Sequence, residues 1–292
     1  MPIVNIAAYR FVSLESLPAL RARVLERCTA LALKGTVLLA PEGINLFLAG
    51  PREAVDAFMA WLREDARFAG MTTKESLSER APFGRLRMRI KREIITMRRP
   101  TIRPEDGRAP ALDAPTLRRW LARGHDDRGR ELVLLDTRNA YETALGAFDG
   151  AVDYRLASFT GFPAAVAADR ARYAGKTVVS YCTGGIRCEK AALHMRELGL
   201  PHVYQLDGGI LGYLEQTDGT GWHGDCFVFD ERGAVDKALL PSPPLPCGET
   251  TAWMQEVEPC REPLPRAEVR EPACAELSSE RALLPHPSGE RR

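Results

Sequence analysis

Hydrophobic and polar positions in the first part of the chain repeat with two different periods. Apolar residues recur every three to four positions over residues 17–33, a spacing typical of an amphipathic helix, and Gly35 is expected to end that helix. A second helix is expected over residues 53–64. Short apolar runs around these helices predict strands at residues 3–11, 36–40, 44–48 and 85–97. The βαββαβ order predicts a ferredoxin-like α+β domain over residues 1–99.

The pattern changes after residues 100–112, a linker rich in proline, arginine and aspartate. A helix over residues 114–122 is expected to have Pro115 in its first turn. Mostly apolar runs predict buried strands at residues 132–136, 177–181 and 203–206. A helix over residues 185–198 is expected between the last two. Strands that alternate with helices predict a parallel α/β sheet, here over residues 113–219.

Residues 220–292 contain a short apolar patch and then become rich in proline, glutamate, arginine and serine, so we expect a largely irregular C-terminal tail. His223 and Cys226 have a zinc-like spacing. Three further cysteines follow at wide intervals, Cys247, Cys260 and Cys274. A structural zinc site needs tighter ligand pairs, so no metal site is predicted. Neither a dinucleotide-binding fingerprint nor a P-loop points to another cofactor.

The composition of the 292-residue chain, 45% hydrophobic and 27% charged, is typical of a globular protein. Its net charge of +1 predicts no particular partner. No apolar run is long enough to cross a bilayer and no secretory signal is evident, so we expect a cytoplasmic protein without a membrane partner. Seven cysteines, an odd number, favour free thiols, catalysis or metal binding over a disulfide framework.

The strongest chemical signal is a glycine-rich loop between the expected strand at residues 177–181 and the helix at residues 185–198. Its residues are Cys182, Thr183, Gly184, Gly185, Ile186 and Arg187. The glycines let successive backbone N–H groups turn toward one anion, and the helix N-terminus and Arg187 add positive charge. These effects lower the pKa of Cys182 below the usual value of about 8.5. We therefore expect a reactive Cys182 thiolate, with the loop residues between it and Arg187 as a cradle for a persulfide.

Two other residues are expected to assist Cys182. Asp136 ends the neighbouring strand, and because reactive groups gather past the carboxyl ends of parallel strands, Asp136 is expected to organise the cationic groups of the loop. Cys188 follows the loop directly, either as a redox partner of Cys182 or as an inert buried cysteine. Four residues separate Cys182 from Arg187, whereas phosphatases that form a cysteinyl phosphate have five. The shorter loop suits a single sulfur atom. The two glycines and the arginine beside Cys182 disfavour a purely structural cysteine.

A basic segment begins at residue 85, and Glu93 is its only acid before residue 101. Strict alternation over residues 85–91 predicts a strand with four cations on one face and three apolar residues in the core. The predicted RNA-binding residues are Arg85, Arg87, Arg89, Lys91, Arg92, Arg98 and Arg99. A merely solvated face would contain more acids, so this stripe favours phosphate binding, and we expect RNA rather than DNA.

Several motifs in fixed order resemble those of one known family. The first are Pro41-Glu42-Gly43-Ile44-Asn45, Lys91-Arg92-Glu93-Ile94-Ile95, Asp136-Thr137-Arg138-Asn139 and Tyr141-Glu142. The later ones are residues 181–190 (YCTGGIRCEK), 203–209 (VYQLDGG) and 226–230 (CFVFD). Over about residues 1–232, the chain closely resembles the rhodanese-domain family of oxygen-dependent tRNA uridine hydroxylases.

The resemblance implies hydroxylation of the wobble uridine of tRNA at ring carbon 5, with molecular oxygen as co-substrate and an unidentified electron donor. It implies an N-terminal acylphosphatase-like (ferredoxin-like) domain, a rhodanese domain, and a persulfide-capable cysteine at Cys182. The implied partner is the anticodon region of tRNA. Family members often carry paired cysteines soon after the FVFD segment, whereas those of this chain stand alone.

Two other functions are compatible with the residues alone. A rhodanese-type sulfurtransferase would deliver persulfide sulfur from Cys182 to a small acceptor or a protein, and the basic segment would serve only for docking. A non-catalytic RNA-binding protein with a vestigial rhodanese domain is disfavoured by the intact loop. The motifs on both sides of the loop favour the hydroxylase.

Overall fold

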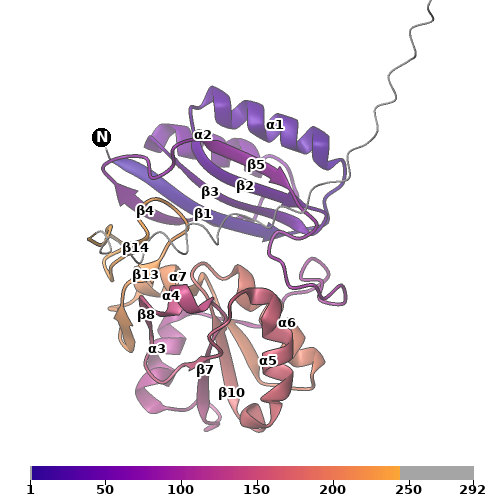
Figure 1. Ribbon diagram of the computed structural model, residues 1–292, viewed down its shortest axis with the longest axis vertical. Coiled ribbons are helices and arrows are strands. Elements are labelled where there is room, and N and C mark those ends of the chain that lie inside the picture. Colours follow the sequence, from indigo (N-terminus) through magenta and orange to yellow (C-terminus); the bar gives the residue numbers. More distant parts are fainter. Residues whose placement is uncertain (1, 244–292) are drawn as a thin grey trace, which may run out of the picture.

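The computed structural model describes residues 2–243, which form two α/β units stacked on each other (Figure 1). Met1 and residues 244–292 lie outside the described residues. The latter range includes Cys247, Cys260 and Cys274 and most of the expected irregular tail. Within residues 2–243, no helix is long and apolar enough to span a membrane.

The N-terminal unit is a five-stranded sheet with two helices on one face. Its strands, β1 (Ile3–Phe11), β2 (Lys34–Ala40), β3 (Gly43–Gly50), β4 (Lys74–Ser78) and β5 (Leu86–Ile90), lie in the order β4-β1-β3-β2-β5. Its helices are α1 (Leu17–Ala30) and α2 (Arg52–Arg63). Val24 and Phe58 of the helices pack with Val37 and Leu46 of the strands in one buried cluster. The opposite face of the sheet is turned toward the C-terminal unit (Figure 1).

Two local expectations for this unit are wrong. The first helix ends at Ala30, and Gly35 lies inside β2 with a φ of 135°. A Cβ at Gly35 would lie 2.0 Å from the carbonyl oxygen of Phe47, so the close approach of two strands requires this glycine. β4 escapes the sequence pattern because it is an edge strand whose sequence, KESLS, is mostly polar.

The basic strand is shorter than the alternation predicts. β5 ends at Ile90, which is 41% exposed, whereas the alternation places this side chain in the core. The backbone N–H of Lys91 still donates to the carbonyl of Leu39 at 2.8 Å, and the chain then leaves the sheet. Ile94 packs between the units, in a cluster with Phe11 and Ile186. The end of β5 is therefore set by this contact between the units, which the local pattern does not contain.

The C-terminal unit is built on a parallel five-stranded sheet. Its strands, β6 (Ala111–Leu112), β7 (Leu132–Asp136), β9 (Val152–Asp153), β10 (Thr177–Tyr181) and β11 (Val203–Leu206), lie in the order β6-β11-β10-β7-β9. Its main helices are α3 (Ala114–Arg123), α5 (Phe162–Ala168), α6 (Ile186–Glu197) and α7 (Gly209–Gln216). α3 contacts α7, and α5 contacts α6. The parallel sheet is confirmed, and β6, at the end of the predicted linker, joins it through β11.

Short elements near the carboxyl end of this sheet are not evident from periodicity. They are α4 (Ala140–Thr143), β8 (Gly146–Phe148), β12 (Trp222–Gly224), β13 (Cys226–Phe227) and β14 (Ala234–Val235). β12 pairs with β8, and β13 pairs with β14. The described part of the region expected to be irregular is therefore folded. β12 pairs with β8 of the C-terminal unit, and Glu231 and Arg232 form hydrogen bonds to Pro82 and Ser76 of the N-terminal unit.

Candidate active site

Cys182 follows β10 directly and lies in the loop that begins α6. Its side chain is fully buried, and the N–H of Gly185 donates to its sulfur at 3.2 Å. Gly185 has a φ of 102°, and a Cβ there would lie 3.1 Å from the Tyr9 hydroxyl, so this turn favours glycine. The loop thus directs backbone N–H groups at the sulfur, in the geometry that the sequence predicts.

The surroundings of Cys182 favour its thiolate. Burial raises the pKa of Cys182, but a hydrogen bond from the Cys188 thiol, the charge of Arg187, and the backbone N–H groups of Cys188 and Arg187 together lower the pKa to about 5. Cys188 shifts the other way, because burial and then its hydrogen bond to Cys182 and the charge of that thiolate raise its pKa. The two sulfurs are 4.0 Å apart. At neutral pH the pair therefore holds one thiolate and one thiol.

Glu142, on α4, holds Arg187 beside this sulfur. Arg187 Nη2 donates to Glu142 Oε2 at 2.7 Å, and Nη1 donates to Oε1. Thr183 donates to the same carboxylate at 3.3 Å. Both side chains of the ion pair are buried, so the guanidinium is kept away from solvent and close to Cys182. Glu142 is part of the Tyr141-Glu142 motif but is not among the predicted site residues.

Asp136 has a different partner from the one expected. It ends β7, and its carboxylate accepts from Arg138 at 2.6 Å (Nη2) and 3.0 Å (Nε). Arg138, which is fully buried, also donates to the carbonyls of Glu142 and Gly146. The expectation that Asp136 organises the cationic groups of the loop is therefore wrong. Arg138, two residues away, takes up the carboxylate, and Asp136 instead supports the segment that carries Glu142.

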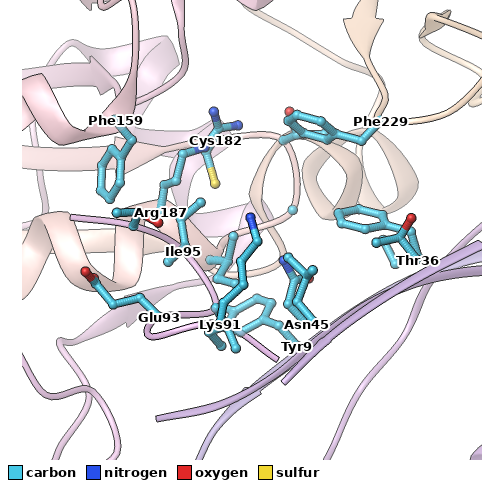
Figure 2. Close-up of a pocket in the computed structure, with 18 of the residues that line it drawn as sticks. Tyr9, Thr36, Asn45, Lys91, Glu93, Ile95, Phe159, Cys182, Arg187 and Phe229 are labelled. Carbon is cyan, nitrogen blue, oxygen red and sulfur yellow. The ribbon is translucent and has the colours of Figure 1, made fainter. Parts of the chain in front are cut away.

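Cys182 faces a cavity of about 410 Å³ between the two units (Figure 2). The floor of the cavity is the helix-free face of the N-terminal sheet. Its residues lie in two rows across the paired strands, Tyr9, Asn45, Leu38 and Arg89 in one, and Ala7, Phe47, Thr36 and Arg87 in the other. The cysteine loop, Phe159 and Phe229 line the other side. The volume is in the range of small-molecule sites.

The predicted RNA-binding residues divide into two groups. Arg87, Arg89 and Lys91 line the cavity, as their common strand face requires. The others do not line it and are exposed on the surface: Arg85, Arg92, Arg98 and Arg99. Positive side chains therefore lie both inside the cavity and on the neighbouring surface.

Two family models match the chain, one for each unit. The UPF0176 acylphosphatase like domain matches residues 3–94, and the Rhodanese-like domain matches residues 117–216. The chain is 61% identical over 247 residues to the tRNA uridine(34) hydroxylase of Cupriavidus taiwanensis, which covers 85% of this chain and 88% of that protein. The protein of the same name from Ralstonia nicotianae is 62% identical with the same coverage. That from Bordetella pertussis is 63% identical over 239 residues, 82% of this chain and 98% of its own.

The chain belongs to the tRNA uridine(34) hydroxylase family. This membership confirms the resemblance, and the matched models confirm the predicted order of an acylphosphatase-like domain and a rhodanese domain. In this member of the tRNA uridine(34) hydroxylase family, the cysteine loop of the rhodanese domain faces the sheet of the acylphosphatase-like domain, and the cavity belongs to both.

A buried ion cluster joins the two domains next to the loop. Lys190, on α6, is 1% exposed, and its Nζ lies 2.7 Å from a carboxylate oxygen of Glu42 and 2.7 Å from one of Glu93. It also donates to the carbonyl of Ile95 at 3.0 Å. Glu42 in turn accepts from the N–H of Ile94 at 2.7 Å. Three of the sequence motifs shared with the tRNA uridine(34) hydroxylase family, those that contain Glu42, Glu93 and Lys190, therefore meet at one lysine.

Glu189 provides a second link between the domains. It accepts from the Tyr9 hydroxyl at 2.9 Å and from Arg108 Nε at 2.8 Å. Neither the Lys190 link nor the Glu189 link is among the predictions from the sequence. The available signal is a charged Glu-Lys pair directly after the loop, on a helix whose other residues are predominantly buried.

No group of three or more His, Cys, Asp or Glu side chains in the described part of the chain is arranged to hold a metal ion. His223 Nδ1 lies 3.0 Å from a carboxylate oxygen of Asp149. Cys226 is fully buried, and burial raises its pKa to about 12.

Proposed function

We propose that this protein hydroxylates ring carbon 5 of the wobble uridine of tRNA in the cytoplasm, with molecular oxygen as co-substrate. The observation that carries this proposal is the Cys182 thiolate facing a cavity that both domains form and that Arg87, Arg89 and Lys91 line. The name of the relatives at 61%, 62% and 63% identity supports uridine 34 of tRNA as the substrate and favours hydroxylation over sulfur transfer.

The position of Cys182 indicates how the base would reach it. The sulfur is buried between the domains, so the base leaves its stack and enters the cavity. Bases of the anticodon loop are single-stranded, and turning such a base out costs only a few kcal/mol. Phe159 and Phe229 offer ring faces for stacking, and the exposed arginines, such as Arg92 and Arg98, are available to the phosphates of the anticodon region.

Within this proposal Cys182 is the catalytic residue and Arg187 keeps its thiolate charged. The loop from Thr183 to Ile186 holds the sulfur, or a persulfide on it, while Asp136 positions the Glu142 segment. Placing one oxygen atom of O₂ on carbon 5 and releasing the other as water consumes two electrons and two protons. Oxidation of Cys182 and Cys188 to a disulfide supplies both electrons, and an external thiol reductant restores the pair.

Nucleoside mass spectrometry of tRNA tests the proposal. In cells that lack the protein, the content of 5-hydroxyuridine and its derivatives will fall, and a plasmid copy of the gene will restore it. Growth under isotopically labelled oxygen gas will place the label in the 5-hydroxyl group. Unchanged modification in the deletion strain, or label only from water, would contradict oxygen-dependent hydroxylation by this protein.

Charge reversal at the cavity will weaken tRNA binding. In the Arg87→Glu/Arg89→Glu variant, we expect the slope of log affinity against log salt to become shallower by about 1 for each arginine, because each neutralised phosphate releases counterions. The matched control is Arg123→Glu/Arg128→Glu, which makes the same change of charge. Arg123 and Arg128 lie near the amino ends of the parallel strands, whereas Cys182 lies at their carboxyl ends. Equal slopes for the two variants would show that the cavity arginines do not contact phosphate.

A further inference from the structure

Several polar side chains line the cavity without a hydrogen bond or an ion pair to the described residues, among them Arg87, Arg89, Asn45 and Lys91. Asn45, the third residue of β3, is 7% exposed, and Lys91 is half-buried just beyond β5. Among residues 2–243, neither side chain has a hydrogen bond or an ion pair. Buried polar groups normally have partners, so these two groups are available to a ligand.

The two side chains meet the same space as the reactive sulfur. Figure 2 shows the Lys91 ammonium group pointing toward the Cys182 sulfur, with the Asn45 amide beside it on the sheet. Phe159 and Phe229 stand on opposite sides of this space. Phe229 contacts Phe47, with ring centres 5.8 Å apart, and Arg187, whose Cζ lies 5.7 Å from the centre of the Phe229 ring. A flat heterocycle between the aromatic walls would turn its polar edge toward Asn45 and Lys91.

The two groups differ in what they accept. An amide both donates and accepts, so by turning over it matches the N3–H and carbonyl edge of uracil or the N3 and amino edge of cytosine. An ammonium group only donates, so it matches the O4 carbonyl of uracil and leaves the amino group of cytosine unpaired. Ring carbon 5 is bonded to carbon 4. Because the Lys91 ammonium group points toward Cys182, a base whose O4 binds Lys91 places the neighbouring carbon 5 on the side of Cys182.

We propose that the cavity reads the Watson–Crick edge of uracil, with Asn45 on the imide and Lys91 on O4, and that Lys91 excludes cytosine. This inference rests on the proposed function and adds the residues that select the base. It assigns Lys91 to the base, whereas the other cations of the basic segment contact phosphates.

The test compares two anticodon stem-loop RNAs that differ only in uridine or cytidine at the wobble position. Wild-type protein and the Lys91→Gln, Lys91→Arg and Asn45→Ala variants are assayed for hydroxylation and, separately, for equilibrium binding. Glutamine can accept a hydrogen bond from the cytosine amino group, so Lys91→Gln is expected to reduce the preference for uridine about tenfold or more in both assays. Lys91→Arg, which still only donates, will retain the preference, and Asn45→Ala will weaken binding of both RNAs.

Arg92→Gln is the matched control, because it removes the same charge from a position outside the cavity. It will lower the affinity for both RNAs equally and leave their ratio unchanged. A Lys91→Gln variant with the wild-type ratio, or a wild type that binds both RNAs equally, overturns the assignment of Lys91 to O4. A wild type that prefers uridine in binding but hydroxylates neither RNA overturns the proposed function and leaves the base-reading site in place.

Discussion

Replacing Cys182 with serine will abolish hydroxylation of tRNA, by a factor on the order of a thousand or more. Serine keeps the size of the side chain but stays protonated, whereas the environment of Cys182 lowers the pKa of the thiol to about 5. The variant also removes the sulfur that would carry a persulfide or form a disulfide with Cys188. Activity is measured as 5-hydroxyuridine formed in undermodified tRNA by the purified protein.

A substitution at another buried cysteine is the control for the general effect of losing a thiol. Cys28, in the core of the N-terminal unit, has its pKa raised to about 12 by burial and lies outside the cavity lining. Cys28→Ala is expected to retain activity. Cys182→Ser is expected to lose activity but to keep the thermal unfolding temperature and the tRNA affinity of the wild type. Hydroxylation by the serine variant at the wild-type rate would mean that Cys182 is not the reaction centre.

Replacing Arg187 with methionine will raise the pKa of Cys182 and destabilise the protein. Burial raises the pKa of Cys182, and without the guanidinium fewer groups oppose this effect. The pKa therefore moves up toward the ordinary value of about 8.5 or beyond. The fully buried Glu142 also loses its ion-pair partner, which costs about 3–5 kcal/mol of the free energy of unfolding. The rate of Cys182 alkylation by iodoacetamide, followed against pH, reports the pKa, and urea unfolding reports the stability.

The Glu142→Gln/Arg187→Met variant separates the two effects. It removes the unpaired carboxylate, so part of the lost stability will return, but the cation near Cys182 is still missing. In the wild type, alkylation will stay fast at neutral pH and decline only as the pH falls to about 5, because the lowered pKa keeps the thiolate present above that value. An unchanged alkylation profile in Arg187→Met would show that the Cys188 hydrogen bond and the backbone N–H groups stabilise the thiolate without Arg187.

The alternating and helical patterns predict those elements in which buried side chains recur at the period of a strand or a helix. β1, α2, β7 and β10 appear where the pattern places them, because each carries a local signal. β4 does not, since only its pairing with β1 makes the polar sequence KESLS a strand. The early end of β5 likewise follows from contacts between the two domains. Local patterns hold no information about such neighbours.

The site shows the same limit. Cys182, its loop and Arg187 are contiguous in sequence, so their combined effect on the sulfur follows from the loop alone. Glu142 lies 45 positions from Arg187, and Glu93 lies 97 positions from Lys190, so these pairings need the fold. Asp136 illustrates the opposite error, because its place at a strand end is correct but a nearer arginine binds it.

The cluster of Lys190 with Glu42 and Glu93 limits the exchange of domains between proteins, in evolution and in protein engineering. Either half of the chain, if exchanged for that of another protein, would leave a buried charge at the junction without its opposite. Viable chimaeras must therefore transfer the lysine and both glutamates as one set, and a neutral residue at one of the three positions would call for matched changes at the others. The rhodanese domain of this protein is not an exchangeable module, because its partner domain supplies both the counter-charges and the floor of its cavity.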